Sequence, residues 1–230
     1  MGGDLQSIVY TASVWIVPVL LAVTLHEAAH GWTAWKLGDD TARTLGRVSF
    51  NPLRHIDPVG TVALPGLLVI LSAPFLFGWA KPVPVNFLRL RDPRRAMVIV
   101  AAAGPAMNFG LAYISALLLH LMPLLPSDAA VWASANLINL IKINIILAVF
   151  NMLPLPPLDG GRVAVGLLPS ALAVPLARLE RFGFAIIIAI MFVVPLLSRQ
   201  LGQNIDPFAW LVIGPVNYVA QIIAIAAVIQ

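Results

Sequence analysis

Cysteine is absent from the 230-residue chain, and charged residues are scarce. The lack of cysteine excludes a disulfide framework, a thiolate metal ligand and a thiol nucleophile. Charged residues make up 10% of the chain and hydrophobic residues 60%, and the mean hydropathy is +0.93. An ordinary soluble domain has about 25% charged residues, so this chain has too little polar surface to coat a soluble globule. The composition predicts an integral membrane protein surrounded by the lipid bilayer.

The net charge of +4 could by itself suggest a nucleic-acid partner. The basic residues, however, gather in short polar segments between apolar runs, chiefly residues 37–58 and 81–95. Basic loops of this kind orient helices in a bilayer, because positive loops stay on the cytoplasmic side. We therefore expect no nucleic-acid partner. We expect instead a multi-pass membrane protein, with both basic segments in the cytoplasm.

A membrane-spanning helix needs about 20 mostly apolar residues. Five runs approach or exceed this length: 8–36, 96–122, 132–153, 182–197 and 208–229. A sixth run, 59–80, is interrupted by prolines and glycines and has a basic segment on each side. This favours a re-entrant segment, although its length would also allow a plain span. We expect an all-α polytopic membrane protein with about five to six transmembrane helices, and a further short apolar segment, 163–177, at the interface.

The sequence HEAAH, residues 26–30, lies in the C-terminal part of the first apolar run. Helix positions i and i+4 share one face, so His26 and His30 can bind one zinc ion together. Zinc would lower the pKa of a bound water toward 7, and Glu27 could then take its proton during attack on a peptide carbonyl. Polar groups inside an apolar helix are costly unless they are paired, metal-bound or functional. The alternative is that these side chains only join helices or lie at a wet helix end.

A catalytic zinc ion usually has three protein ligands and one open position. Asp159 is the acidic residue that stands out as the third ligand, in the segment NMLPLPPLDGG at 151–161. The prolines there stop a helix, and the glycines allow close backbone approach. Irregular backbone near membrane depth is tolerated where protein or a water-filled cavity surrounds it. As an alternative, Asp159 is a helix cap or a turn residue at the interface.

Several motifs together resemble the site-2 protease family of intramembrane zinc metalloproteases, in its compact bacterial form without appended domains: HEAAH, FGWAKPVPVN, AAAGPAMN and NMLPLPPLDGGR. The resemblance implies one zinc ion per chain, bound by His26, His30 and Asp159, with Glu27 as the general base. It also implies a bacterial cytoplasmic membrane protein whose active site opens toward the cytoplasm. We expect a single metalloprotease domain over 1–230, with a catalytic core at about 8–162 and C-terminal helices at about 163–230.

The resemblance places Asn108 and Asn151 near the site, where an amide N–H could donate to the oxyanion or to the substrate backbone. Interhelical hydrogen bonding is the alternative for both. The implied substrates are transmembrane proteins or peptides, first cut by an upstream protease. A substrate helix must unwind before water can attack it, and a small β element near the active site could capture it by main-chain pairing. Residues 47–50 and 83–87 are the candidate strands, with solvated loops as the alternative.

Other residues allow other interpretations. His55 could approach the metal or line a water entry, but a loop histidine is more often a turn or surface residue, and His120 suits an interfacial or packing position. A protease of the type that processes prenylated or loop substrates would use a later Glu ligand, for which Glu180 is the candidate. A third class is a non-proteolytic zinc-binding receptor, chaperone or transporter, against which the intact Glu27 argues.

Overall fold

The computed structural model describes residues 2–70 and 78–228. Within these residues, five helical segments are long and apolar enough to cross a membrane: Leu5–Lys36, Pro93–Leu119, Ser127–Asn151, Glu180–Gln200 and Ala209–Ala226. They coincide with the five runs expected from hydropathy. The protein is therefore a multi-pass membrane protein. The expected all-α fold is confirmed, and five helices have the length and apolar composition of the five to six expected transmembrane helices.

The first spanning helix, α1 (Gly2–Lys36), continues through Pro18 without a break. Near its end, the Lys36 ammonium lies 4.7 Å from the ring centroid of Trp35 and 5.6 Å from that of Trp32. Tryptophan is enriched at membrane interfaces, and lysine reaches toward water there. The chain then turns at Gly38, whose φ of +114° favours glycine. The C-terminal end of α1 thus has the side chains expected at a membrane surface.

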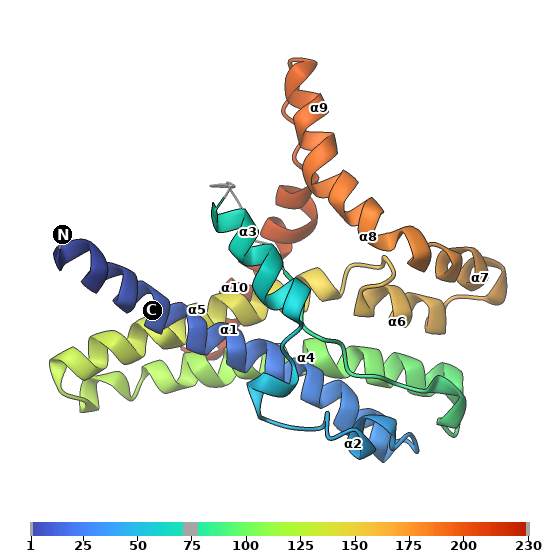
Figure 1. The fold of residues 1–230 in the computed structure, drawn as a ribbon, viewed down its shortest axis with the longest axis horizontal. Coiled ribbons are helices and arrows are strands. Elements are labelled where there is room, and N and C mark those ends of the chain that lie inside the picture. Colours follow the sequence, from blue (N-terminus) through green and yellow to red (C-terminus); the bar gives the residue numbers. More distant parts are fainter. Residues whose placement is uncertain (1, 71–77, 229–230) are drawn as a thin grey trace.

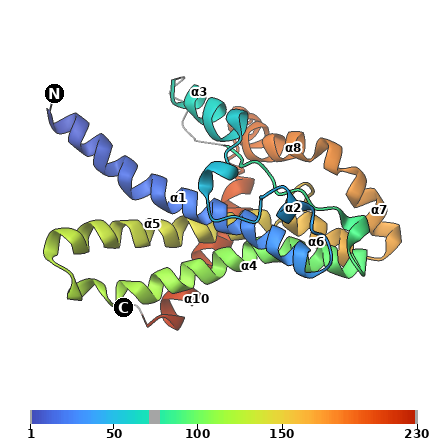
Figure 2. The same cartoon turned by 60° about the horizontal axis from the view of Figure 1, so that its bottom comes forward.

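The central bundle is made of α1, α4 (Pro93–Leu119) and α5 (Ser127–Asn151), which pack against one another (Figure 1, Figure 2). A short connection that includes the 3-10 turn Met122–Leu124 joins α4 to α5. Ala112 and Ala116 of α4 are fully buried in one cluster with Ile145 of α5. Small residues allow this close packing, which in lipid replaces the hydrophobic effect as the source of helix association.

Two short helices follow α5, namely α6 (Asp159–Leu167) and α7 (Ser170–Arg178). The apolar segment 163–177 is therefore divided between two helices at Pro169. Helix α6 packs on α4, where Nε of Arg94 donates to the carbonyl oxygen of Gly166 at 2.9 Å. This packing brings Asp159, the first residue of α6, to the side of the central bundle.

The fourth span consists of α8 (Glu180–Ile188), a π-helical turn (Ala189–Val193) and α9 (Val194–Gln200), and the fifth of a π-helical turn (Ala209–Ile213) and α10 (Gly214–Ala226). In Figure 1, α8 and α9 extend away from the central bundle. Helix α10 instead packs on α4 and α5. The C-terminal helices therefore do not contribute equally to the core.

In its described residues, 37–70 and 78–92, the connection between α1 and α4 contains only short helices: α2 (Thr41–Thr44), a 3-10 turn (Pro52–Arg54), a π-helical turn (Pro58–Ala63), α3 (Leu64–Ile70) and a 3-10 turn (Phe87–Arg89). The run 59–80, expected to be re-entrant, includes residues 71–77, which lie outside the described residues. Its path through or back out of the membrane therefore stays a prediction.

The small β element expected at 47–50 and 83–87 is not confirmed, because the backbone of both segments is irregular. Arg47 N donates to the carbonyl oxygen of Ala42 at 2.8 Å, and two N–H groups of the second segment bond to side chains. Val83 N donates to Oε2 of Glu27 at 2.8 Å, and Asn86 N donates to Oδ2 of Asp39 at 2.6 Å. Proline offers no N–H to a strand ladder, and both Pro82 and Pro84 lie in this stretch.

Candidate metal centre

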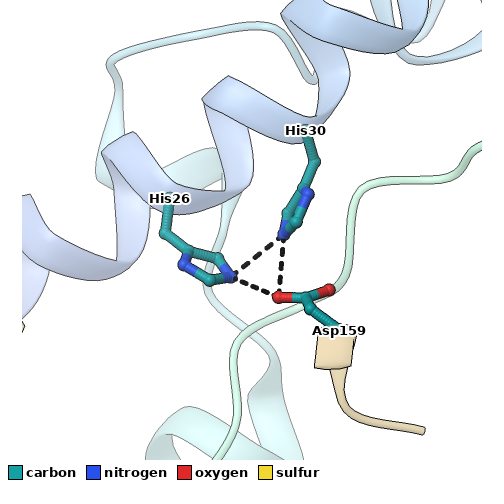
Figure 3. A group of neighbouring side chains, drawn as sticks. All are labelled: His26, His30 and Asp159. Carbon is teal, nitrogen blue, oxygen red and sulfur yellow. Dashed lines mark hydrogen bonds and ion pairs between the residues drawn. The ribbon is translucent and has the colours of Figure 1, made fainter. Parts of the chain in front are cut away.

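Three buried side chains from two distant parts of the chain meet beside the central bundle. His26 and His30 project from successive turns of α1, and Asp159 approaches them from the start of α6 (Figure 3). The two Nε2 atoms are 3.0 Å apart. Oδ2 of Asp159 lies 3.2 Å from Nε2 of His26 and 3.3 Å from Nε2 of His30. The structure thus brings together the three residues that the sequence indicated as metal ligands.

The spacing of these atoms fits a small tetrahedral cation. Zinc–nitrogen and zinc–oxygen bonds of about 2.0–2.2 Å place neighbouring ligand atoms about 3.3 Å apart at the corners of a tetrahedron. The ligand atoms of His26, His30 and Asp159 all lie within 4.8 Å of one another. Two imidazoles and a carboxylate are also a typical donor set for catalytic zinc, with the fourth position left open. These residues could therefore hold one zinc ion.

Hydrogen bonds on the far side of each imidazole define its tautomer. His30 Nδ1 lies 2.7 Å from the carbonyl oxygen of Val100, which can only accept, so this nitrogen carries the proton. His26 Nδ1 lies 2.5 Å from Oδ1 of Asn108. Both Nε2 lone pairs then point toward each other and toward the carboxylate of Asp159. A cation would stabilise this convergence of electron-rich atoms, and such outer bonds are typical of metal-binding histidines.

The orientation of the Asn108 amide is itself determined by its neighbours. Asn108 is fully buried, and its Nδ2 donates to the carbonyl oxygen of Ala22 at 3.2 Å and to Oδ1 of Asn144 at 2.6 Å. Asn144, on α5, in turn donates to the carbonyl oxygen of Leu140 at 2.8 Å. Oδ1 of Asn108 is therefore the atom that faces His26. Asn144 was not among the residues predicted from the sequence, although an asparagine in an apolar helix is a signal of an interhelical hydrogen bond.

Glu27 and Asn151, also indicated by the sequence, make hydrogen bonds outside this cluster. Glu27 is half-buried next to His26 and accepts from Val83, as described above. Asn151 is the last residue of α5, and its Nδ2 donates to the carbonyl oxygen of Leu147 at 3.0 Å. The predicted substrate contacts of Asn108 and Asn151 stay predictions.

Two further histidines and Glu180 lie outside the three-residue cluster. His55 is buried, with Nε2 at 2.9 Å from the carbonyl oxygen of Ser49. His120 lies at the C-terminal end of α4, where its Nε2 is 2.7 Å from the carbonyl oxygen of Ala227. Oε1 of Glu180 is 3.5 Å from Nη2 of Arg162. His120 thus joins α4 to the end of α10, and Glu180 pairs with a base at the surface.

A turn rich in proline and glycine presents Asp159 to the two histidines. Helix α5 ends at Asn151, and α6 begins at Asp159 after seven residues without regular structure. Gly160 and Gly161 are buried against this turn, and a Cβ on either one would collide with its backbone, at Met152 and Pro156 respectively. Glycine is therefore required at both positions if the carboxylate is to reach α1.

The fold and this cluster together define a membrane protein with a buried group of residues that could hold a metal ion, next to the carboxylate of Glu27. Residues 125–194 match the profile of peptidase family M50. The chain is 39% identical over 195 residues to the Bacillus subtilis protein named "Putative zinc metalloprotease YwhC", which covers 83% of this chain and 85% of that protein. The chain therefore belongs to peptidase family M50, the site-2 protease family.

Two mycobacterial proteins, both named "Putative zinc metalloprotease Rip2", are also similar to this chain. The Mycolicibacterium smegmatis protein is 32% identical over 183 residues, which are 78% of this chain and 66% of that protein. The protein of Mycobacterium tuberculosis strain H37Rv is 33% identical over 164 residues, which are 69% of this chain and 60% of that protein. No solved structure shows a significant match. The family and these names support a zinc metalloprotease of the membrane.

Proposed function

We propose that this protein is an intramembrane zinc metalloendopeptidase that hydrolyses peptide bonds within or near the transmembrane segments of other membrane proteins. The observation that carries the proposal is the buried cluster of His26, His30 and Asp159. The two histidines and the neighbouring Glu27 lie on α1, a helix long enough to cross the bilayer. Buried ionisable groups at membrane depth are costly, and they generally mark functional sites.

His26, His30 and Asp159 would hold one zinc ion per chain, which would supply the Lewis acidity that polarises a scissile carbonyl and makes water easier to deprotonate. Glu27 takes the proton of the attacking water and delivers it to the leaving amine. Because Glu27 follows His26 directly in α1, its carboxylate lies beside the metal ligands without being one of the three. Asn108 and Val100 keep each imidazole in the tautomer that leaves Nε2 free to bind the metal.

Asn151 is the better candidate for a direct contact with the substrate. Both N–H groups of the Asn108 amide already have acceptors, Ala22 and Asn144, so Asn108 acts mainly through His26. Nδ2 of Asn151 donates to Leu147, and an amide nitrogen carries a second hydrogen. That hydrogen could be donated to the developing oxyanion or to the substrate backbone.

The depth of the cluster determines the kind of substrate. His26 lies ten residues before Lys36, which is about 15 Å along a helix. The reaction would therefore take place below the membrane surface, on the side of the basic loops. We place this side in the cytoplasm of a bacterial cell. The hydrogen bonds of a transmembrane helix shield its peptide bonds from attack by water. We therefore expect substrates that an upstream protease has already shortened, because a helix unwinds more readily at a cut end.

The test uses the purified, zinc-loaded protein in detergent or liposomes with a transmembrane peptide substrate. We expect Glu27→Gln to abolish cleavage while zinc content stays at one ion per chain. Asp159→Ala should lose zinc as well as cleavage, and a chelator should stop the wild-type reaction. Glu180→Gln is the matched control, because its carboxylate lies near Arg162 at the surface, and it should change neither zinc content nor cleavage.

Three results would contradict the proposal. Metal-dependent cleavage by purified Glu27→Gln protein would exclude Glu27 as the general base. Zinc transport into vesicles without any peptide cleavage would favour a non-proteolytic zinc protein. Zinc binding that survives Asp159→Ala and fails in Glu180→Ala would instead support the prenyl-processing type of protease, which the position of Glu180 does not favour.

A further inference from the structure

Arg47 is a buried cation without a carboxylate partner among the described residues. It lies in the connection between α1 and α4, and only 9% of the residue is exposed. Its Nε is buried without a hydrogen-bond partner. A buried guanidinium with no counter-charge is expensive. We therefore expect Arg47 to have a role that offsets the free-energy cost of its burial.

The guanidinium of Arg47 binds the backbone of a distant segment that leads to the proposed active site. Its Nη2 donates to the carbonyl oxygen of Lys81 at 2.5 Å and lies 3.4 Å from that of Pro82. The same segment is anchored on both sides of these contacts. Lys81 N donates to the carbonyl oxygen of His55 at 2.9 Å, and Asn86 N donates to Asp39.

The next residue of this segment contacts the proposed general base. Val83 N donates to Oε2 of Glu27 at 2.8 Å. Pro82 and Pro84 have no N–H, so Val83 is the one main-chain donor between Lys81 and Val85. The segment thus presents a single N–H to the carboxylate. Arg47 holds the two carbonyl groups that immediately precede this N–H.

We propose that Arg47 is a positioning residue for Glu27 and that it acts through the backbone of Lys81, Pro82 and Val83. A glutamate side chain has three rotatable bonds, and a general base needs its carboxylate within hydrogen-bond reach of the proton that it takes. The Val83 N–H restrains one carboxylate oxygen and leaves the other for the reaction. The inference rests on the proposed role of Glu27 as general base.

The chemistry of the side chain explains why arginine suits this position. The planar guanidinium can donate to two carbonyl oxygens with a fixed geometry, whereas the ammonium of lysine is a compact point charge on a flexible stem. Arg47→Lys should therefore retain only part of the effect. Arg54 is a matched control, because it lies in the same connection, is exposed, and donates to the carbonyl oxygen of Gly46.

The first experiment compares cleavage kinetics of Arg47→Gln, Arg47→Lys and Arg54→Gln with the wild type. Misplacement of a reacting group by about 1 Å can cost about 100-fold in rate. We expect kcat to fall by about this factor in Arg47→Gln and by less in Arg47→Lys. KM and zinc content should stay unchanged in both, and Arg54→Gln should match the wild type.

A second pair of variants tests the same step without changing a charge. Val83→Pro removes the N–H that reaches Glu27, whereas Val83→Ala trims the side chain and keeps the N–H. Val83→Pro should lower kcat as Arg47→Gln does, and Val83→Ala, which keeps the N–H, should lower it by less. This pair keeps the inference testable if Arg47→Gln does not fold.

Hydrogen exchange at the Val83 amide gives a readout that does not depend on cleavage. The amide should exchange slowly in the wild type and faster in both Glu27→Ala and Arg47→Gln, but not in Arg54→Gln. Unchanged kcat in Arg47→Gln, with an active wild type, would overturn the inference. A fall in kcat that is matched by an equal fall in the zinc content and stability of Arg47→Gln would also overturn it. Failure of the wild type to cleave any substrate would instead count against the proposed function, while the exchange data would still report on the Arg47–Val83–Glu27 connection.

Discussion

Gly104 of α4 lies directly against the imidazole of His26, so that a Cβ on this glycine would be 2.6 Å from Nε2 of His26. Asn108, one helical turn further along α4, supplies the hydrogen bond to the other nitrogen of the same ring. The two positions share a helix face. Gly104 allows α4 to approach α1 closely, and Asn108 orients the imidazole of His26.

Gly104→Ala should therefore disturb the metal centre with little direct effect elsewhere. Overpacking a tightly packed site costs about 1–3 kcal/mol, and here the displaced atoms are the imidazoles of His26 and His30. We expect weaker zinc binding, measured by competition with a chelator, and a parallel loss of cleavage. Gly110→Ala, on the same helix with no atom within 4 Å of its Cβ, should bind zinc like the wild type. Equal zinc affinity in the two variants would contradict this account.

Asn144→Leu should weaken zinc binding although Asn144 does not touch either histidine. Its Oδ1 accepts from Asn108 and thereby keeps Oδ1 of Asn108 facing His26. Loss of such outer partners typically costs about 10–100-fold in metal affinity, and we expect a value near the lower end. Asn139→Leu is the control: Asn139 is also buried on α5, but it donates to the carbonyl oxygen of Val14. If both substitutions lower zinc affinity equally, the effect is one of bundle stability.

Asp39 links protein stability to pH. Burial alone would raise the pKa of its carboxyl, but hydrogen bonds from the hydroxyl and N–H of Thr41 and from Asn86 N outweigh burial and lower the pKa. A lowered pKa in the folded state means that the stabilisation is complete above the ordinary carboxyl value, about pH 4. It is then lost as pH falls through the lower pKa of the folded protein.

We therefore expect Asp39→Asn to be less stable than the wild type at pH 7, with a difference that narrows below pH 4. The measurement is thermal unfolding of the zinc-free protein in detergent, because acid would also remove a metal from its histidines. Asp40→Asn is the control, since its pair with Arg89 is half-exposed and such pairs contribute about 0–1 kcal/mol. A difference between Asp39→Asn and the wild type that is the same at pH 7 and pH 3 would contradict the prediction.

The lack of native cysteine allows a direct test of orientation. Leu53 and Leu124 lie on the connections before and after α4, and both are well exposed. With the basic segments in the cytoplasm, a membrane-impermeant maleimide added to intact cells should label Leu124→Cys and not Leu53→Cys. Permeabilised cells should label both. The reverse pattern would place the opening of the active site outside the cytoplasm.

Local patterns in the sequence were sufficient to predict the spanning helices and part of the candidate site. Hydropathy identifies a spanning helix because such a helix contacts lipid along its whole length. This contact requires a continuous run of apolar residues, which is visible in the sequence. The spacing of His26 and His30 places them on one helix face for the same reason. Glu27 follows from its place in the motif. These features need no knowledge of how the helices pack.

Alternation of polar and apolar residues was too short a signal at 47–50 and 83–87. The expected β element is not confirmed, because strand formation depends on a partner with free N–H and C=O groups. In this protein the carboxylates of Glu27 and Asp39 and the guanidinium of Arg47 bind those backbone groups. Prolines on both sides of Val83 further reduce the donors that a ladder would need.

By itself, the sequence determined the membrane class, five spans and the pairing of two histidines on one helix, because hydropathy and helical periodicity act between near neighbours. The sequence predicted Asp159 as the third ligand but left a helix cap or turn residue open, and only the tertiary structure decided that it meets these histidines. Only the tertiary structure showed that Asn144 supports Asn108, and that Arg47 and Glu27 both bind the backbone of residues 81–83. Hydrogen-bond partners are selected by which helices pack together and how closely. That choice depends on small residues such as Gly104, whose effect becomes visible only when two helices are in contact.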